Sequence, residues 1–241
     1  MDDRMTAIDH RVHAAEANAN PFSMDYLDRI FRAAKEHGYQ FQTLSEFIAG
    51  GHSSERKLAL RLDLDFKPAS LKPFVTLARK HHVTATLFVR VCGPYNVLWY
   101  PAYSAIKDAA DAGFEIGLHT AVVEWATING TDPEHILATE LSLLRSLFPV
   151  RGIAPHRDVN YMHNSLPWLH DNWGDLSQRY GLTYHAYQES ILSPVNYINE
   201  GLSPHLCWRG DDPFDVMKTG RSIYMLLHPH WWYVEHAFEH E

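Results

Sequence analysis

Two carboxylates stand two residues apart at the end of a hydrophobic segment. Asp63 and Asp65 follow the apolar run 57–62, which has the character of a buried strand. Because side chains alternate across a strand, both acids are expected on the same face. Like charges this close repel unless a cation or a raised pKa relieves them, which suits a metal ligand beside a general base. The alternative is one capping Asp and one solvated Asp at a strand end.

Three other expected strands end in histidine. His119 and His228 come directly after the segments 114–118 and 223–227, and His156 (followed by Arg157) comes after 150–154 with Pro155 between. In an α/β barrel the carboxyl ends of the strands form one mouth, where catalytic residues collect. Aspartate oxygen and histidine nitrogen suit zinc or another divalent first-row metal. The four strand ends together therefore predict a metal site at this mouth.

Strands alternate with helices along the part of the chain that must position these residues. Strands are expected at 57–64 and 83–90, in addition to the three above, and helices at about 24–37, 69–81, 101–112 and 133–147. Less regular strands are expected near 182–186, 195–198 and 205–208. This alternation predicts an α/β fold with a parallel sheet, and the chain is long enough to close it into a barrel.

The segment 158–181 differs from its surroundings because it is rich in Trp, His and Asn. It is expected to be a loosely structured connection with one or two short helices. A long connection of this kind in a compact domain is often a binding loop. Trp168 and Trp173 are therefore candidates for substrate contact, with packing of the segment onto the barrel as the alternative.

The composition narrows the class of protein. The 241 residues are 46% hydrophobic and carry a net charge of −8, with no basic stripe, which argues against a nucleic-acid partner. No apolar run reaches the roughly 18 residues of a membrane span. Cys92 and Cys207 are too few for a disulfide framework, and the first residues do not resemble a secretion signal, so a cytoplasmic location is expected. We expect an N-terminal arm at 1–23 and a single domain at 24–241.

Several motifs together resemble the polysaccharide deacetylases of the NodB-homology type, the carbohydrate esterase 4-like family. The similarity is greatest to a bacterial branch whose first motif reads Arg-His-Asp-Val-Asp, and it extends over about 24–232. It is carried by four stretches: Arg61-Leu62-Asp63-Leu64-Asp65, 85–90 with Tyr95-Asn96 downstream, 113–119 and 226–232. The resemblance implies an irregular (β/α)7-8 barrel of the polysaccharide deacetylase type.

The resemblance also implies a role for each matching residue. Asp63 corresponds to the general base, Asp65 to the aspartate ligand of the metal, and His119 to its first histidine ligand. Arg157 lies where the family has an arginine that orients the base. His228 corresponds to the histidine that protonates the leaving amine.

Two further positions are implied to be near the substrate. Trp208 falls near the active-site tryptophan of the family, and Glu200 lies where the family often has an aspartate. The sequence departs from the family at Val123, where a second histidine ligand is expected. Glu124 or His156 can complete the metal site, and we favour His156 because it ends a strand at the same rim.

These observations lead to two hypotheses of different classes. The first is a metal-dependent hydrolase, with zinc as the expected divalent metal, that removes an N-acetyl group from an amino sugar in a polysaccharide or its precursor. The second is a non-catalytic sugar-binding or scaffolding relative with an incomplete metal site. Both expect a carbohydrate partner, and the positions of His156 and Glu124 relative to Asp65 and His119 separate them.

Overall fold

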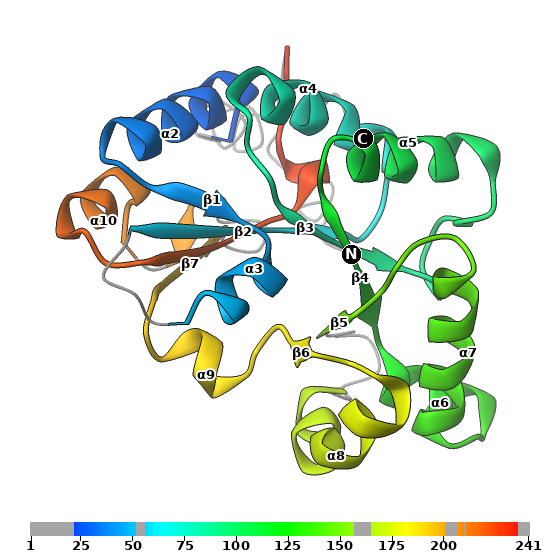
Figure 1. The fold of residues 1–241 in the computed structure, drawn as a ribbon. Coiled ribbons are helices and arrows are strands. Elements are labelled where there is room, and N and C mark those ends of the chain that lie inside the picture. The colour runs from blue at the N-terminus through cyan, green and yellow to red at the C-terminus, as the bar shows by residue number, and fades with distance from the viewer. Residues whose placement is uncertain (1–21, 52–55, 157–164, 201–206, 210, 236–241) are drawn as a thin grey trace, which may run out of the picture.

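A single curled sheet surrounded by helices organises the protein (Figure 1). The structure is a computed structural model that describes residues 22–51, 56–156, 165–200, 207–209 and 211–235. The strands lie in the order β6-β5-β4-β3-β2-β9-β7-β8, and β1 pairs with the first part of β2. All neighbours are parallel except β7 and β8. The predicted parallel α/β sheet is confirmed, and in the described residues it forms a half-barrel whose outermost strands are β6 and β8.

The strands are short and most are preceded by a helix. Their bounds are β1 Gln40–Gln42, β2 Lys57–Leu64, β3 Thr86–Arg90, β4 Glu115–Thr120, β5 Gly152–Pro155, β6 Tyr184–His185, β7 Asn196–Glu200, β8 Trp208–Arg209 and β9 Ile223–Leu227. The helices are α2 Met24–Glu36, α3 Leu44–Ala49, α4 Leu71–His81, α5 Tyr100–Asp111, α6 Val122–Asn129, α7 Pro133–Arg145, α8 Ser165–Tyr180, α9 Glu189–Leu192 and α10 Pro213–Thr219, with 3-10 turns at Pro68–Ser70 and Pro229–Trp231.

Strand β2 separates two hydrophobic layers. All eight of its residues are buried. Its four leucines belong to the outer core beneath the helices: Leu58, Leu60, Leu62 and Leu64. Ala59 belongs to the inner cluster, on the concave face of the sheet. Since alternate side chains share a face, Arg61, Asp63 and the residue that follows the strand, Asp65, extend the inner row.

Aromatic side chains fill the lower part of the concave face. Phe88 and Tyr184 are fully buried there, with ring centroids 6.4 Å apart. A Cβ atom at Gly117 would lie 2.4 Å from Phe88, and one at Gly152 would lie 2.1 Å from Tyr184. The two rings therefore occupy space that only glycine leaves open, and the polar residues are left to the carboxyl ends of the strands.

The helix boundaries follow local signals in the sequence. The Ser23 side chain accepts a hydrogen bond from the backbone N–H of Tyr26 and caps α2. Asp132 caps α7 in the same way through Glu134, and Pro133 occupies its first position. The predicted helices 24–37 and 133–147 are thus confirmed, with ends within about two residues.

The prediction for 158–181 was wrong in its described part. Residues 165–180 form one continuous 16-residue helix, α8, in place of a loosely structured connection. Only Ser165, Leu169 and Leu176 are buried along it, so its apolar periodicity is faint. The helices α6, α9 and α10 were not expected at all.

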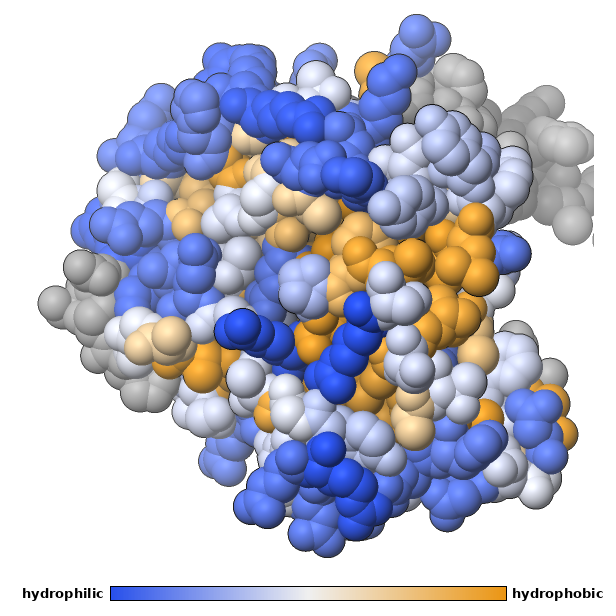
Figure 2. Space-filling view, turned by 45° about the vertical axis from the view of Figure 1, so that its right-hand side comes forward, coloured by the Kyte–Doolittle hydropathy of each residue, from blue (hydrophilic) through white to orange (hydrophobic). Residues whose placement is uncertain are grey.

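The surface is not uniformly polar. With the right-hand side of Figure 1 turned forward, Figure 2 shows an apolar area bordered by hydrophilic side chains. None of the helices in the described residues is both long and apolar enough to cross a membrane. Cys92 and Cys207 are both free thiols.

Candidate metal centre

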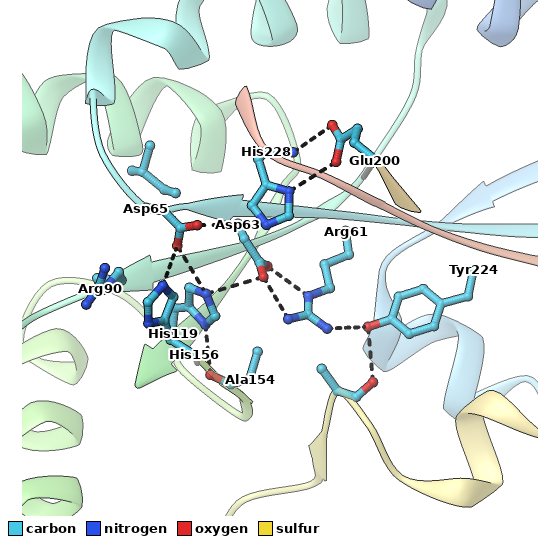
Figure 3. A network of polar contacts seen from close by, with 12 residues as sticks. Arg61, Asp63, Asp65, Arg90, His119, Ala154, His156, Glu200, Tyr224 and His228 are labelled. Carbon is cyan, nitrogen blue, oxygen red and sulfur yellow. Dashed lines mark hydrogen bonds and ion pairs between the residues drawn. The ribbon is translucent and has the colours of Figure 1, made fainter. Parts of the chain in front are cut away.

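Four parallel strands bring their carboxyl ends to one edge of the sheet. Asp65, His119, His156 and His228 come from β2, β4, β5 and β9, or from the residue just after them. In the strand order, β9 lies on one side of β2, whereas β3, β4 and β5 lie on the other. The histidines therefore reach Asp65 from both sides, as Figure 3 shows.

Three of these side chains form a group with the donor set of a metal site. Ligand atoms of Asp65, His119 and His156 all lie within 4.8 Å of one another. Two of the three residues are buried and His156 is half-buried. Among the described residues this is the one cluster of at least three His, Cys, Asp or Glu side chains with that geometry. The cluster could hold a metal ion, and its carboxylate and imidazole donors suit a divalent first-row metal.

The hydrogen bonding of His119 points its free nitrogen at two carboxylates. Nδ1 lies 2.9 Å from the carbonyl oxygen of Ala154, which can only accept, so Nδ1 carries a proton. Nε2 then lies 3.2 Å from Oδ1 of Asp65 and 3.3 Å from Oδ2 of Asp63. A lone pair on Nε2 facing two carboxylate oxygens is unfavourable, so either Nε2 carries a proton or a cation lies between them. A backbone carbonyl that fixes the tautomer is also a common outer partner of metal-bound histidine.

Asp65 offers an oxygen that the protein itself does not satisfy. Its Oδ1 atom is buried without a hydrogen bond in the structure, since the 3.2 Å contact with His119 lacks hydrogen-bond direction. Burial raises the pKa of Asp65, but the contact with His119 and the nearby His228 and His156 lower it below its usual range. A buried, ionised and unpaired oxygen is a good fit for a bound cation.

His156 is held in the form that binds metals. Burial lowers the pKa of its imidazole to about 4, and the neighbouring His119 and Arg90 act in the same direction. The ring lies 5.1 Å from that of His119, and Nε2 lies 3.8 Å from Oδ1 of Asp65. A neutral imidazole is the ligand form of histidine, so His156 is ready to bind at neutral pH.

Asp63 has a different partner, which the sequence did not reveal. Arg61 is fully buried and forms a bidentate ion pair with Asp63. Its Nε donates to Oδ1 at 2.8 Å and its Nη2 donates to Oδ2 at 2.7 Å. Burial raises the pKa of Asp63, but the charge and hydrogen bonds of Arg61, together with His119 and His228, lower it below its usual range. The guanidinium is also held by the hydroxyl of Tyr224 at 3.2 Å and lies 4.6 Å from the ring centre of Tyr187. Arg61 therefore fixes Asp63 in its ionised form.

On the other side of β2, Glu200 orients His228. One carboxylate oxygen of Glu200 accepts from the backbone N–H of His228 at 2.9 Å and from the indole of Trp232 at 2.5 Å. The other lies 3.0 Å from Nδ1 of His228. Burial alone would lower the pKa of His228, but the hydrogen bond and charge of Glu200 raise it to about 9. The ring is thus protonated at neutral pH, with Nε2 3.8 Å from Oδ2 of Asp65.

The remaining candidates lie away from this centre or have other partners. Glu200 is 2% exposed and fully engaged by His228 and Trp232, so the structure gives it a positioning geometry and no free face for a substrate. The Trp208 indole donates to the hydroxyl of Tyr26 at 3.0 Å and packs on Phe22. Arg157 lies outside the described residues.

The two tryptophans of the 158–181 segment are on helix α8. Trp168 and Trp173 are partly buried and pack against the outer core. The ring of Trp173 lies 4.8 Å from that of His185. These contacts match the packing alternative, and a role of either residue in substrate contact stays a prediction.

Glu124 does not join the metal cluster. Its carboxylate is 1% exposed on α6 and accepts a hydrogen bond from the Ser165 hydroxyl at 2.6 Å. The backbone N–H of Val123 donates to the same hydroxyl. Of the two residues that could compensate for Val123, the structure brings only His156 to Asp65 and His119.

No protein-family model matches the chain, and no curated protein matches it.

Proposed function

We propose that the protein is a metal-dependent hydrolase that removes an N-acetyl group from an amino sugar. The observation that carries this proposal is the convergence of Asp65, His119 and His156 within 4.8 Å beside an ionised Asp63. The similarity of the motifs to polysaccharide deacetylases, together with the curled α/β sheet, supports the irregular barrel of that family as part of the proposal. Zinc is the metal we expect, because one carboxylate and two imidazoles are a frequent catalytic zinc set.

Each residue then has a chemical task. A divalent cation held by the three ligands would polarise the amide carbonyl and make water a better nucleophile. Asp63, ionised by Arg61, accepts the proton of the attacking water. His228 donates a proton to the nitrogen as the C–N bond breaks, so that acetate and a free amine leave. Glu200 keeps His228 protonated for this step.

The order of the strands supports separate positions for the metal ligands and for the proton donor. The metal ligands His119 and His156 reach Asp65 from the β4 and β5 side, while His228 reaches it from the β9 side. A substrate amide above Asp65 would thus have the cation towards one flank and the proton donor towards the other. General acids and bases act within hydrogen-bond reach of the reacting atoms, which this spacing permits.

Metal analysis with an activity test decides between the two hypotheses. The purified protein should bind about one equivalent of zinc and release acetate from N-acetylated amino sugars in a chelator-sensitive way. His156→Ala should lose the metal and the activity together, because it removes one of three ligands. His135→Ala, which removes an exposed histidine on α7, is the matched control and should change neither.

Other results would contradict the proposal. A protein with no bound metal and no metal-stimulated acetate release would refute it. Glycan binding that is indifferent to chelator, without turnover, would favour the non-catalytic sugar-binding alternative.

A further inference from the structure

Arg90 lies in the strand between two strands of the metal centre. Strand β3 separates β2 from β4, and Arg90 pairs in register with His119. Phe88, two residues earlier, belongs to the inner cluster, so Arg90 faces the same concave side. Figure 3 shows its side chain beside His156 with no contact to any other residue drawn. A guanidinium group therefore borders the proposed metal ligands.

The stem of Arg90 is held in place by the loop that follows β3. A Cβ atom at Gly93 would lie 2.9 Å from Cβ and 3.5 Å from Nε of Arg90, so the loop crosses the stem at a position that favours glycine. The Tyr95 hydroxyl accepts from the backbone N–H of Arg90 at 3.0 Å and donates to the carbonyl of Leu64 at 2.9 Å. Arg90 is only 8% exposed. Its position is thus fixed before any ligand arrives.

The guanidinium nevertheless lacks an anionic partner in the described residues. No carboxylate there lies within 4.0 Å of it, and its one hydrogen bond runs to the carbonyl of Cys92 at 3.4 Å. Of the acids on this side of the sheet, Asp63 is paired with Arg61, Glu140 is engaged through both oxygens by Thr120 and Cys92, and Asp65 belongs to the candidate metal cluster. A guanidinium has five N–H donors, which one long hydrogen bond to a carbonyl does not satisfy.

We propose that Arg90 recognises an anionic group of the substrate, so that the preferred amino sugar carries a carboxylate or a phosphate beside its acetamido group. The choice of amino sugar rests on the proposed function. The planar guanidinium binds either anion through two parallel hydrogen bonds, which fixes orientation as well as affinity. The competing explanation is that Arg90 only balances the charge of Glu140 at a distance.

Binding and turnover are measured with three probes that share the acetamido group. N-acetylglucosamine is neutral, N-acetylmuramic acid carries a carboxylate, and N-acetylglucosamine 1-phosphate carries a phosphate. Calorimetric titration of each into zinc-loaded and zinc-free protein gives affinities that do not depend on catalysis. One of the two acidic sugars should bind at least about tenfold more tightly than the neutral one, and which of them does so identifies the anion.

Variants assign the preference to Arg90. Arg90→Met keeps the length of the stem and should weaken binding of the preferred acidic sugar by about 10- to 100-fold, while affinity for the neutral sugar changes less than about threefold. Arg90→Lys keeps the positive charge but cannot form two parallel hydrogen bonds, so its affinity for the acidic sugar should lie between those of wild type and Arg90→Met. Arg79→Met, which removes a half-exposed arginine paired with Asp108, is the matched control.

The outcomes separate the two proposals. Equal affinity of wild type for all three sugars, or an acidic preference that survives in Arg90→Met, would overturn the role of Arg90 even if acetate is released. Acidic preference lost in Arg90→Met without any acetate release would support Arg90 and refute the deacetylase. If Arg90→Met does not fold, the wild-type preference and Arg90→Lys decide the question.

Discussion

Asp63 in β2 and Asp65 just after it have the same side chain on the same face of the sheet, but different electrostatic surroundings. Asp63 is paired with Arg61, a cation that belongs to the chain and is fully buried with it. Asp65 is surrounded by imidazoles at 3.2 to 3.8 Å and keeps one oxygen without a hydrogen bond. The first carboxylate has a permanent counter-ion within the chain, whereas the second belongs to a cluster that could hold an exchangeable cation. Two residues of spacing are enough to separate a fixed ion pair from a binding site.

The largest expected effect comes from substitution of Asp65, the carboxylate without a counter-ion in the chain. Asp65→Asn removes the ligand charge, so zinc binding and acetate release should both fall to background. The folded state should persist in zinc-free buffer, because Asp65 has no hydrogen bond to lose at Oδ1. Zinc content after dialysis and a thermal melt measure the two quantities. A variant that keeps stoichiometric zinc would show that Asp65 is not a ligand.

Substitution of Asp63, the carboxylate paired with Arg61, should affect activity but not zinc binding. Asp63→Asn should retain zinc while acetate release falls by about 10²- to 10⁴-fold, the usual contribution of a general base. The same dialysis and activity measurements apply. Loss of zinc equal to that of Asp65→Asn would erase the distinction between the two carboxylates. Asp111→Asn, on the surface of α5, is a suitable control.

Removal of Arg61, the buried cation paired with Asp63, should lower the free energy of unfolding more than it lowers zinc binding. Arg61→Met leaves Asp63 buried and unpaired and should destabilise the fold by about 3–5 kcal/mol. In an Asp63→Asn background the same change should cost distinctly less, because no buried charge is left behind. Denaturant midpoints of the four proteins give the coupling. Equal costs in both backgrounds would mean that the ion pair contributes no coupling energy.

A third carboxylate extends the comparison to the outer surface. Burial raises the pKa of Asp28, but hydrogen bonds from His81 and Lys80 and the charge of Arg32 lower it to about 2. Its folded pKa is below the unfolded value, so its stabilisation is present above about pH 4 and lost as the pH falls through 2. Asp28→Asn should cost about 1 kcal/mol at neutral pH, since Lys80 and Arg32 are more than half exposed.

Measurement of unfolding free energy against pH checks this smallest effect. The difference between wild type and Asp28→Asn should shrink between pH 4 and 2. A difference that is constant over this range would show that Asp28 does not titrate as the structure indicates.

The strands were predictable from the sequence because their periodicity is strong and local. The expected strand 57–64 coincides with β2, whose leucines alternate with inward residues over eight positions. The length of helix α8 was missed, since only one or two short helices were expected there, because it carries Pro167 and Gly174 and buries only three side chains. Helix α6 was missed because it starts two residues after β4 without a turn signal. Local patterns thus predicted the sheet better than the helices that cover its lower end.

The site was partly predictable for a similar reason. The strand ends indicated Asp65, His119 and His156 as neighbours, and the structure places them together. The roles of Arg61 and Arg90 were not visible, because their significance depends on what lies across the sheet. Tyr224 contacts Arg61 from 163 positions further along the chain, and no spacing rule connects the two. Alternation along β2 did hold one usable signal, since it puts Arg61 on the same face as the two acids.

The origin of the three metal donors in β2, β4 and β5 has a consequence for the folding pathway. Strands β4 and β5 are consecutive and pair with each other, whereas β3 lies between β2 and β4 both in the sequence and in the sheet. A bound ion could contact all three donors only after β2, β3, β4 and β5 had assembled, so it would not take part in the first steps of folding. The chain segments that connect these four strands are long, so their pairing is expected to be slow. Their assembly would not depend on the metal. The time course of zinc uptake during refolding would then report the last step of assembly.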